Sequence, residues 1–92
     1  MVKKTASDVN QKEIETTILR LLEQRAPGKT ICPSEVARAV AGSAQRAAWE
    51  PLMEPVRSVA ARLVSERKIV ITQKGQVIDG NTAKGPIRFR LR

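Results

Sequence analysis

Histidine and tyrosine are absent from this 92-residue sequence, and cysteine, tryptophan and phenylalanine each occur once. Without histidine, the chain lacks the side chain that enzymes use most often as a general base and a metal ligand. It also has no phosphate-cradling glycine motif of the nucleotide-hydrolase type and no Ser-centred nucleophile elbow. We therefore expect no catalytic residues, no metal site and no cofactor, and a protein that is not an enzyme.

The single cysteine, Cys32, excludes an internal disulfide and a metal site built on several cysteines. Cys32 stands just before a predicted helix start, where the positive end of the helix would stabilise a thiolate. A reactive thiol and a buried or capping thiol therefore both remain open, and a small apolar side chain of this kind favours the second.

Long apolar runs are missing as well. No stretch approaches the roughly 18 apolar residues that a membrane span needs. The segment Met1-Val2-Lys3-Lys4 is not followed by the apolar region of a signal peptide. We expect a cytoplasmic protein without a membrane partner.

Positive charge, by contrast, is in excess. The formal net charge is +8, and it is unevenly distributed along the chain. There are 11 basic and 8 acidic side chains up to Arg67, a net charge of +3, and six basic against one acidic from Lys68 to the end, a net charge of +5. Such a field attracts polyanions, nucleic acid above all, although it would also suit a basic protein that its charge merely keeps dispersed.

The sequence predicts one domain over residues 11–92, preceded by a flexible polar tail over residues 1–10. Asn10 and Glu13 have the spacing of a helix cap, and Ala26-Pro27-Gly28 ends the helix that follows. The apolar face of this first helix has helical spacing and consists of Ile14, Ile18, Leu21 and Leu22.

Residues 29–31 fit a short edge strand, and Cys32-Pro33-Ser34-Glu35 opens a second helix with proline at its first position. Three alanines in residues 43–50 favour an extra helical turn, although nine residues from Gly42 to Glu50 are long for a helix-turn-helix connection. The core face of the second helix consists of Val36, Ala37, Val40 and Ala41.

A third amphipathic helix begins near Pro51 and extends to about residue 67. Pro55 predicts an irregular first turn, because proline supplies no backbone donor. The buried stripe of this helix consists of Leu52, Val56, Val59, Ala60, Leu63 and Val64. The opposite face carries Glu54, Arg57, Ser58, Ala61, Arg62 and Ser65.

The last quarter of the chain predicts strands. Residues 69–73 are mostly β-branched, and Lys74-Gly75 resembles a turn. Residues 76–78 could extend a hairpin, and Asp79-Gly80-Asn81 is another turn signal. In the final segment Ile87, Phe89 and Leu91 alternate with Arg88, Arg90 and Arg92, which predicts one buried and one cationic face. The predicted fold is α+β and winged-helix: a three-helix core with a helix-turn-helix-like pair, closed by a basic C-terminal β-hairpin wing.

Four stretches carry a further pattern: Gly28-Lys29-Thr30-Ile31-Cys32-Pro33-Ser34-Glu35-Val36-Ala37, Trp49 with Leu52-Met53-Pro55-Val56-Arg57, Gln73-Lys74-Gly75, and Gly85-Pro86-Ile87-Arg88. Together they resemble a small bacterial family classed as a domain of unknown function. The similarity extends from about Ile14 to Leu91 and implies a winged-helix fold. It implies no activity, because that family has none established.

The predicted function is binding of double-stranded DNA, in the manner of a transcription-related regulator. The third helix would enter the major groove, which admits a helix with slim side chains, and the wing would contact phosphates. Glu54 and Glu66 count against tight phosphate contact, and Glu15 and Glu66 are interpreted as solubilising surface charges. The predicted nucleic-acid-binding residues are Arg57, Ser58, Ala61, Arg62, Ser65, Lys74, Lys84, Arg88 and Arg90.

Other partners remain open. The alternative is a winged-helix module for protein–protein contact, which predicts an exposed apolar patch around Trp49, Leu52 and Met53. Structured RNA and a homodimer are further alternatives. Single-stranded RNA is disfavoured, because Trp49 and Phe89 are the only aromatic residues and both are expected in the core.

Overall fold

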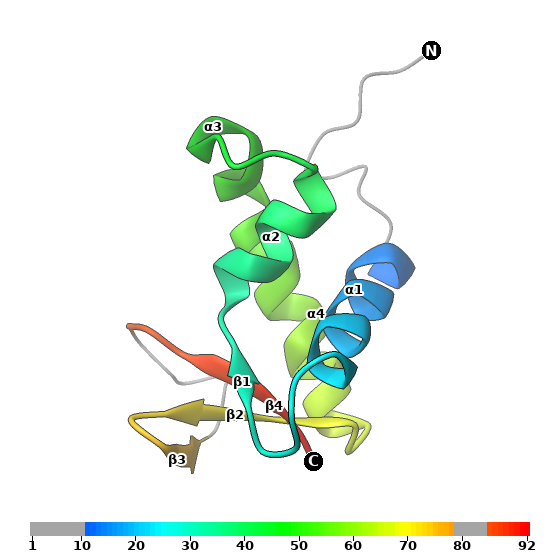
Figure 1. Ribbon diagram of the computed structural model, residues 1–92, viewed down its shortest axis with the longest axis vertical. Helices are drawn as coiled ribbons and strands as arrows, with labels where there is room; N and C mark the ends of the chain where they lie inside the picture. The colour runs from blue at the N-terminus through cyan, green and yellow to red at the C-terminus, as the bar shows by residue number, and fades with distance from the viewer. Residues whose placement is uncertain (1–10, 79–84) are drawn as a thin grey trace.

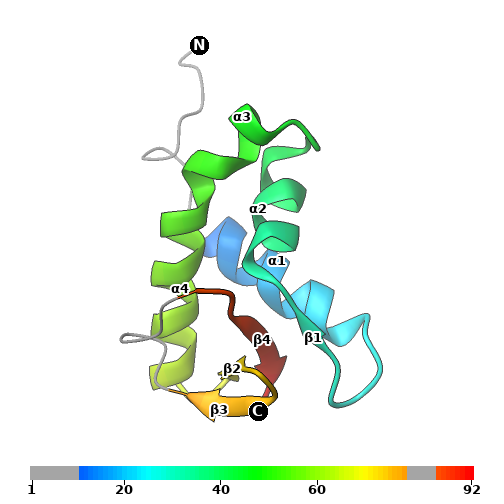
Figure 2. The same ribbon diagram turned by 90° about the vertical axis from the view of Figure 1, so that its left-hand side faces the viewer.

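The helices of this protein lie on one face of a single antiparallel sheet (Figures 1 and 2). The short helix formed by residues 46–49 lies at the end of the described chain that is farthest from that sheet. The computed structural model describes residues 11–78 and 85–92. The predicted tail over residues 1–10 with Asn10, the turn Asp79-Gly80-Asn81 and Lys84 lie outside the described residues. The elements are α1 (Gln11–Glu23), β1 (Thr30–Ile31), α2 (Pro33–Ala41), α3 (Arg46–Trp49), the 3-10 helix η2 (Glu50–Leu52), α4 (Met53–Ser65), β2 (Ile69–Gln73), β3 (Gln76–Ile78) and β4 (Arg88–Leu91).

This architecture confirms the predicted α+β class and is compatible with a winged-helix-like fold. The alanine-rich connection does form an extra turn, α3, and residues 76–78 do pair as a strand, β3. None of the helices in the described part of the chain is long and apolar enough to cross a bilayer.

The last strand in sequence is a central strand in space. The sheet order is β1-β4-β2-β3, and all pairs are antiparallel. Phe89 of β4 lies opposite Ile31 of β1 on one side and Ile71 of β2 on the other. All three side chains are buried, so this is the face that the helices cover. Because side chains alternate along a strand, Arg88 and Arg90 lie on the opposite, outer face of the sheet.

The buried core joins all the main elements and contains most of the residues that periodicity assigned to it. Leu21, Val40, Ala41 and Val64 were also predicted there, but they are half-buried and pack against its rim. The buried apolar residues are Ile14, Ile18, Leu22, Ile31, Val36, Ala37, Leu52, Val56, Val59, Ala60, Leu63, Ile69, Ile71, Ile87 and Phe89.

The predicted burial of the final segment, residues 87–92, is right at two positions and wrong at the third. Ile87 and Phe89 are buried, whereas Leu91 is 39% exposed. Leu91 is the last residue of its strand, opposite Ile69 at the first position of β2. Ile69 is fully buried, so alternation overestimated the burial of Leu91 but not that of its partner across the sheet.

The start of α4 confirms the predicted irregular first turn. The 3-10 helix η2 contains Pro51, and α4 begins directly after it at Met53. Pro55 is then the third residue of α4. The first four backbone N–H groups of a helix have no partner within the helix, so proline at this position removes no helical hydrogen bond.

Trp49 lies between the core and solvent rather than inside the core. Its ring is half-buried and packs against the core cluster, its Nε1 donates to the carbonyl of Ala44 at 3.2 Å, and the Arg38 guanidinium lies 5.7 Å from the ring centroid. The tryptophan thereby holds α3 against α2.

Candidate nucleic-acid interface

The predicted binding residues lie on two elements, the outer face of α4 and the sheet. Five of them belong to α4: Arg57, Ser58, Ala61, Arg62 and Ser65. Three belong to the sheet: Lys74 in the turn between β2 and β3, and Arg88 and Arg90 on β4. The ninth, Lys84, falls outside the described residues.

The outer face of α4 is slim, as the sequence predicted. Val56, Val59, Ala60 and Leu63 turn toward the core, which leaves Ser58 and Ser65 exposed and Ala61 half-buried. The Ser65 hydroxyl donates to the Arg62 carbonyl at 2.7 Å, so it is engaged with its own helix.

Arg57 connects α4 to the segment that leads into β4. Its Nη2 donates a long hydrogen bond, 3.5 Å, to the carbonyl oxygen of Gly85. The same segment is held from β2, because Gln73 Nε2 donates to the Pro86 carbonyl at 3.2 Å. Gly85 has φ of +83°, a left-handed conformation that glycine adopts without strain. Arg57 thus connects the outer face of α4 to the segment that leads into β4.

Arg62 lies in a different environment. Its Nη2 is 2.6 Å from Glu15 Oε1 on α1, and its Nη1 is 3.0 Å from Glu66 Oε2. Lys68 joins the same group, with Nζ 3.5 Å from Glu15 Oε2 and 3.3 Å from Glu66 Oε1. We call these four residues the α1–α4 charge cluster. Glu15 and Glu66, interpreted from sequence as solubilising charges, are its two anions.

The titration of the α1–α4 charge cluster follows from this geometry. The hydrogen bond from Arg62 lowers the pKa of Glu15, and burial opposes that effect. Hydrogen bonds from Arg62 and then Lys68 lower the pKa of Glu66. The hydrogen bond to Glu66 raises the pKa of Lys68. All four groups are therefore held in their charged forms at neutral pH.

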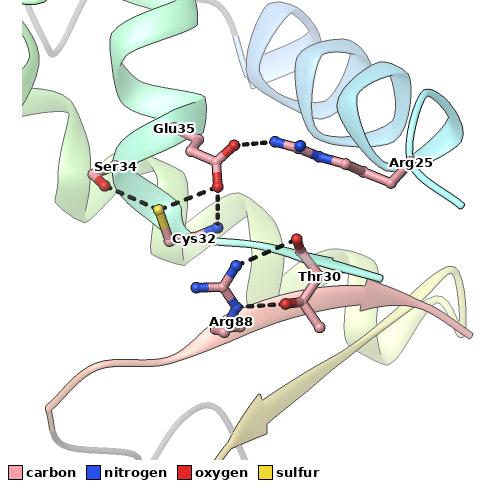
Figure 3. Close-up of polar contacts among 6 residues, drawn as sticks. All are labelled: Arg25, Thr30, Cys32, Ser34, Glu35 and Arg88. Atoms are coloured by element: carbon pink, nitrogen blue, oxygen red, sulfur yellow. Dashed lines mark hydrogen bonds and ion pairs between the residues drawn. The ribbon is translucent and has the colours of Figure 1, made fainter. Parts of the chain in front are cut away.

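On the outer face of the sheet, Arg88 is anchored and Arg90 is not. Arg88 reaches across to β1, where its Nε donates to Thr30 Oγ1 and its Nη2 to the Thr30 carbonyl at 3.4 Å (Figure 3). Arg90 is half-buried, and Lys74 is exposed at the turn with φ of +53°. Within residues 11–78 and 85–92, neither Arg90 nor Lys74 forms an ion pair.

A second polar group surrounds the start of α2 (Figure 3). Glu35 accepts from the backbone N–H of Cys32 at 3.2 Å and from its thiol at 3.4 Å, and its other oxygen pairs with Arg25. Burial acts to raise the pKa of Glu35, but the two Cys32 hydrogen bonds and the charges of Arg25 and Arg88 together outweigh it, and the net shift is downward. Cys32 is therefore a half-buried residue at the helix cap, in agreement with the capping interpretation.

The sequence pattern placed Glu35 at the helix start. It predicted neither the ion pair of Glu35 with Arg25 nor the hydrogen bonds of Arg88 to Thr30. The spacing of Cys32 and Glu35 is that of a capping box, so a local signal existed for the cap. No local signal exists for the other two contacts, because Arg25 and Thr30 reach their partners only through the tertiary fold.

The protein–protein alternative predicted an exposed apolar patch around Trp49, Leu52 and Met53, and these side chains are more buried than that prediction requires. Leu52 is buried, and Trp49 and Met53 are half-buried against the core.

In the described part of the chain, no group of three or more His, Cys, Asp or Glu side chains lies close enough to hold a metal ion.

The fold and this surface define a small α+β domain whose sheet carries unpaired positive charge. The chain belongs to the family described as "Protein of unknown function (DUF3253)", whose model matches residues 11–92. The predicted resemblance to a family of unknown function is therefore confirmed. No curated protein matches the chain.

Proposed function

We propose that this protein is a winged-helix module that binds double-stranded DNA. In this proposal α2 and α4 form the helix-turn-helix-like pair, with α3 and η2 in the connection, and the segment from β2 to β4 is the wing. The position of β4 between β1 and β2 supports this assignment, because the last strand of the wing then returns to the middle of the sheet.

The observation that carries the proposal is the charge of the sheet. From Ile69 onward, the ionisable side chains of the described residues are all basic: Lys74, Arg88, Arg90 and Arg92. None of these four side chains pairs with a carboxylate of the described residues, and Arg88 is anchored on Thr30 instead. Unpaired cations on one rigid sheet attract the closely spaced phosphates of a duplex, and each contact releases a counterion.

The adjacent part of α4 fits a groove. Ser58 and Ala61 have short side chains, and the major groove, about 12 Å wide, admits a helix with such a face. Arg57 lies between this face and the wing, since it contacts Gly85. A duplex could therefore touch the helix and the wing at the same time.

The test is the salt dependence of binding to a short random-sequence DNA duplex. A variant Arg90→Gln removes one proposed phosphate contact, so we expect weaker binding and a log–log salt slope reduced by about 0.9. The matched control is Arg46→Gln, which removes the same charge from α3, at the far end of the molecule from the sheet (Figures 1 and 2). We expect no change in slope for this control.

Absence of binding at low salt would overturn the proposal. Equal effects of Arg90→Gln and Arg46→Gln would also overturn it, because only net charge would then matter. Competition with duplex RNA provides the second arm: stronger competition by RNA than by DNA would reassign the site to structured RNA.

A further inference from the structure

We infer that Glu15 and Glu66 limit the DNA-binding surface of α4, by keeping Arg62 and Lys68 in the α1–α4 charge cluster and away from phosphate. This inference rests on the proposed duplex binding and identifies which of the predicted cations take part. It makes Arg57 the arginine of α4 that faces DNA.

The first argument is charge balance. Each of the two cations of the cluster lies within 3.5 Å of both carboxylates, so that two positive and two negative groups form a closed arrangement. Its net charge is zero. A phosphate approaching the end of α4 therefore meets two carboxylates along with the two cations, and repulsion offsets the attraction.

The second argument is the position of Glu15. It lies 47 residues before Arg62 in the sequence, and its side chain is only 13% exposed. Withdrawing Arg62 to bind a phosphate would leave this largely covered carboxylate without its closest partner, and an unpaired charge of that kind is costly. The lowered pKa of Glu15 agrees with a carboxylate that stays ionised in this position.

The third argument is the direction of the two arginines. Arg57 and Arg62 are five residues apart, which places them about 140° apart around a helix with 3.6 residues per turn. Arg57 is on the side of α4 that meets Gly85 and the wing, and Arg62 is on the side that meets α1. A duplex lying against the wing therefore approaches the first arginine and not the second.

The experiment compares salt slopes for the same random-sequence DNA duplex. For Arg57→Gln we expect a slope reduced by about 0.9, equivalent to an affinity change of about 3.5-fold between 50 and 200 mM salt. For Arg62→Gln we expect an unchanged slope. An Arg62→Gln slope that falls as much as that of Arg57→Gln would overturn the inference.

The second part of the experiment frees a cation of the α1–α4 charge cluster by removing one of its anions. Glu15→Gln removes one of the two anions, so we expect tighter binding and a slope steeper by about 0.9 as a cation becomes available. The control is Glu50→Gln, which frees Arg46 from an equivalent ion pair on α3, far from the sheet. Equal gains for the two variants would overturn the inference, because the gain would then reflect net charge alone.

Glu15→Gln and Arg62→Gln remove a contact between two helices, so circular dichroism must show that each is folded under the binding conditions. Glu66→Gln is the second variant: it keeps the Glu15–Arg62 pair between the helices and removes only the anion at the end of α4. It should steepen the slope in the same way, and a slope equal to that of the unaltered protein would contradict the inference. If the unaltered protein does not bind the duplex at all, the proposed function fails first.

Discussion

The α1–α4 charge cluster and the outer face of the sheet both present arginine near solvent, yet only the sheet leaves such charge unpaired. In the cluster, Arg62 is held by Glu15 and Glu66. On the sheet, Arg88 is held by a neutral residue, Thr30, and Arg90 forms no ion pair with a described residue. The comparison shows that the availability of a surface arginine depends on which side chain a neighbouring element brings to it.

The two regions also differ in what they do for the fold. The pairs that Glu66 forms with Arg62 and Lys68 are partly exposed, so water screens them and they add little to stability. Glu15 is largely covered, and its pair with Arg62 holds the end of α4 against α1. The outer face of the sheet adds no such contact between helices. Its arginines are positioned by β4, and the opposite face of β4 carries the largest buried side chain, Phe89.

The largest effect is expected from a substitution in the core that removes the support of the sheet arginines. Phe89→Ala removes a fully buried ring from the strand that holds Arg88 and Arg90, and we expect a loss of about 3–5 kcal/mol in the free energy of unfolding. Urea denaturation followed by circular dichroism measures it. Leu91→Ala is the control on the same strand and face, with a loss below about 1 kcal/mol because Leu91 is partly exposed. Similar losses for the two variants would show that β4 is not anchored by Phe89.

The α1–α4 charge cluster should make the free energy of unfolding depend on pH. The pKa of Glu15 is lowered in the folded protein, so its pairing with Arg62 stabilises the fold at neutral pH and is lost as the pH falls through that lowered pKa. We expect the urea midpoint of Glu15→Gln to be below that of the unaltered protein at neutral pH, and the gap to narrow as the pH falls below the ordinary pKa of a glutamate and through the lowered pKa of Glu15. Glu23→Gln, at the exposed C-terminal end of α1, should show no such gap. A gap that persists unchanged in acid would contradict the prediction.

The smallest expected effect concerns the turn between β2 and β3, where one substitution should raise the stability of the fold and weaken DNA binding. Lys74 and Gly75 both have positive φ, as in a two-residue hairpin turn that favours Asn-Gly. Lys74→Asn should therefore stabilise the fold by about 0.5 kcal/mol while reducing the salt slope of duplex binding by about 0.9. Thermal unfolding and the binding assay test the two parts. An unchanged slope would remove Lys74 from the proposed interface, and a lower melting temperature would contradict the turn argument.

Several features of the fold were predictable from local patterns. Apolar residues at helical spacing identified α1, α2 and α4, and alternation identified β4 with its buried Phe89. Pro51 and Pro55 predicted the irregular start of α4, since proline restricts the backbone wherever it occurs. The exposure of Leu91 was not predictable in this way, because periodicity assigns a side chain to a face but not how completely its neighbours cover it.

The candidate site was predictable as a set of residues but not as an arrangement. The sequence identified Arg57, Arg62, Arg88 and Arg90 as cations of the candidate site, without separating paired from unpaired side chains. It gave no indication that Arg62 would meet Glu15, that Arg88 would be anchored on Thr30, or that Arg57 would reach Gly85. These contacts span 47, 58 and 28 residues of the chain, far beyond the reach of any helical or strand repeat.

By itself, the sequence determined the order of helices and strands and the concentration of positive charge in its last quarter, because both are properties of neighbouring residues. Only the tertiary structure decided which of those charges are neutralised and which remain unpaired. The physical reason is that a charge is balanced by whatever lies within a few ångströms in space, and that neighbourhood is created by folding.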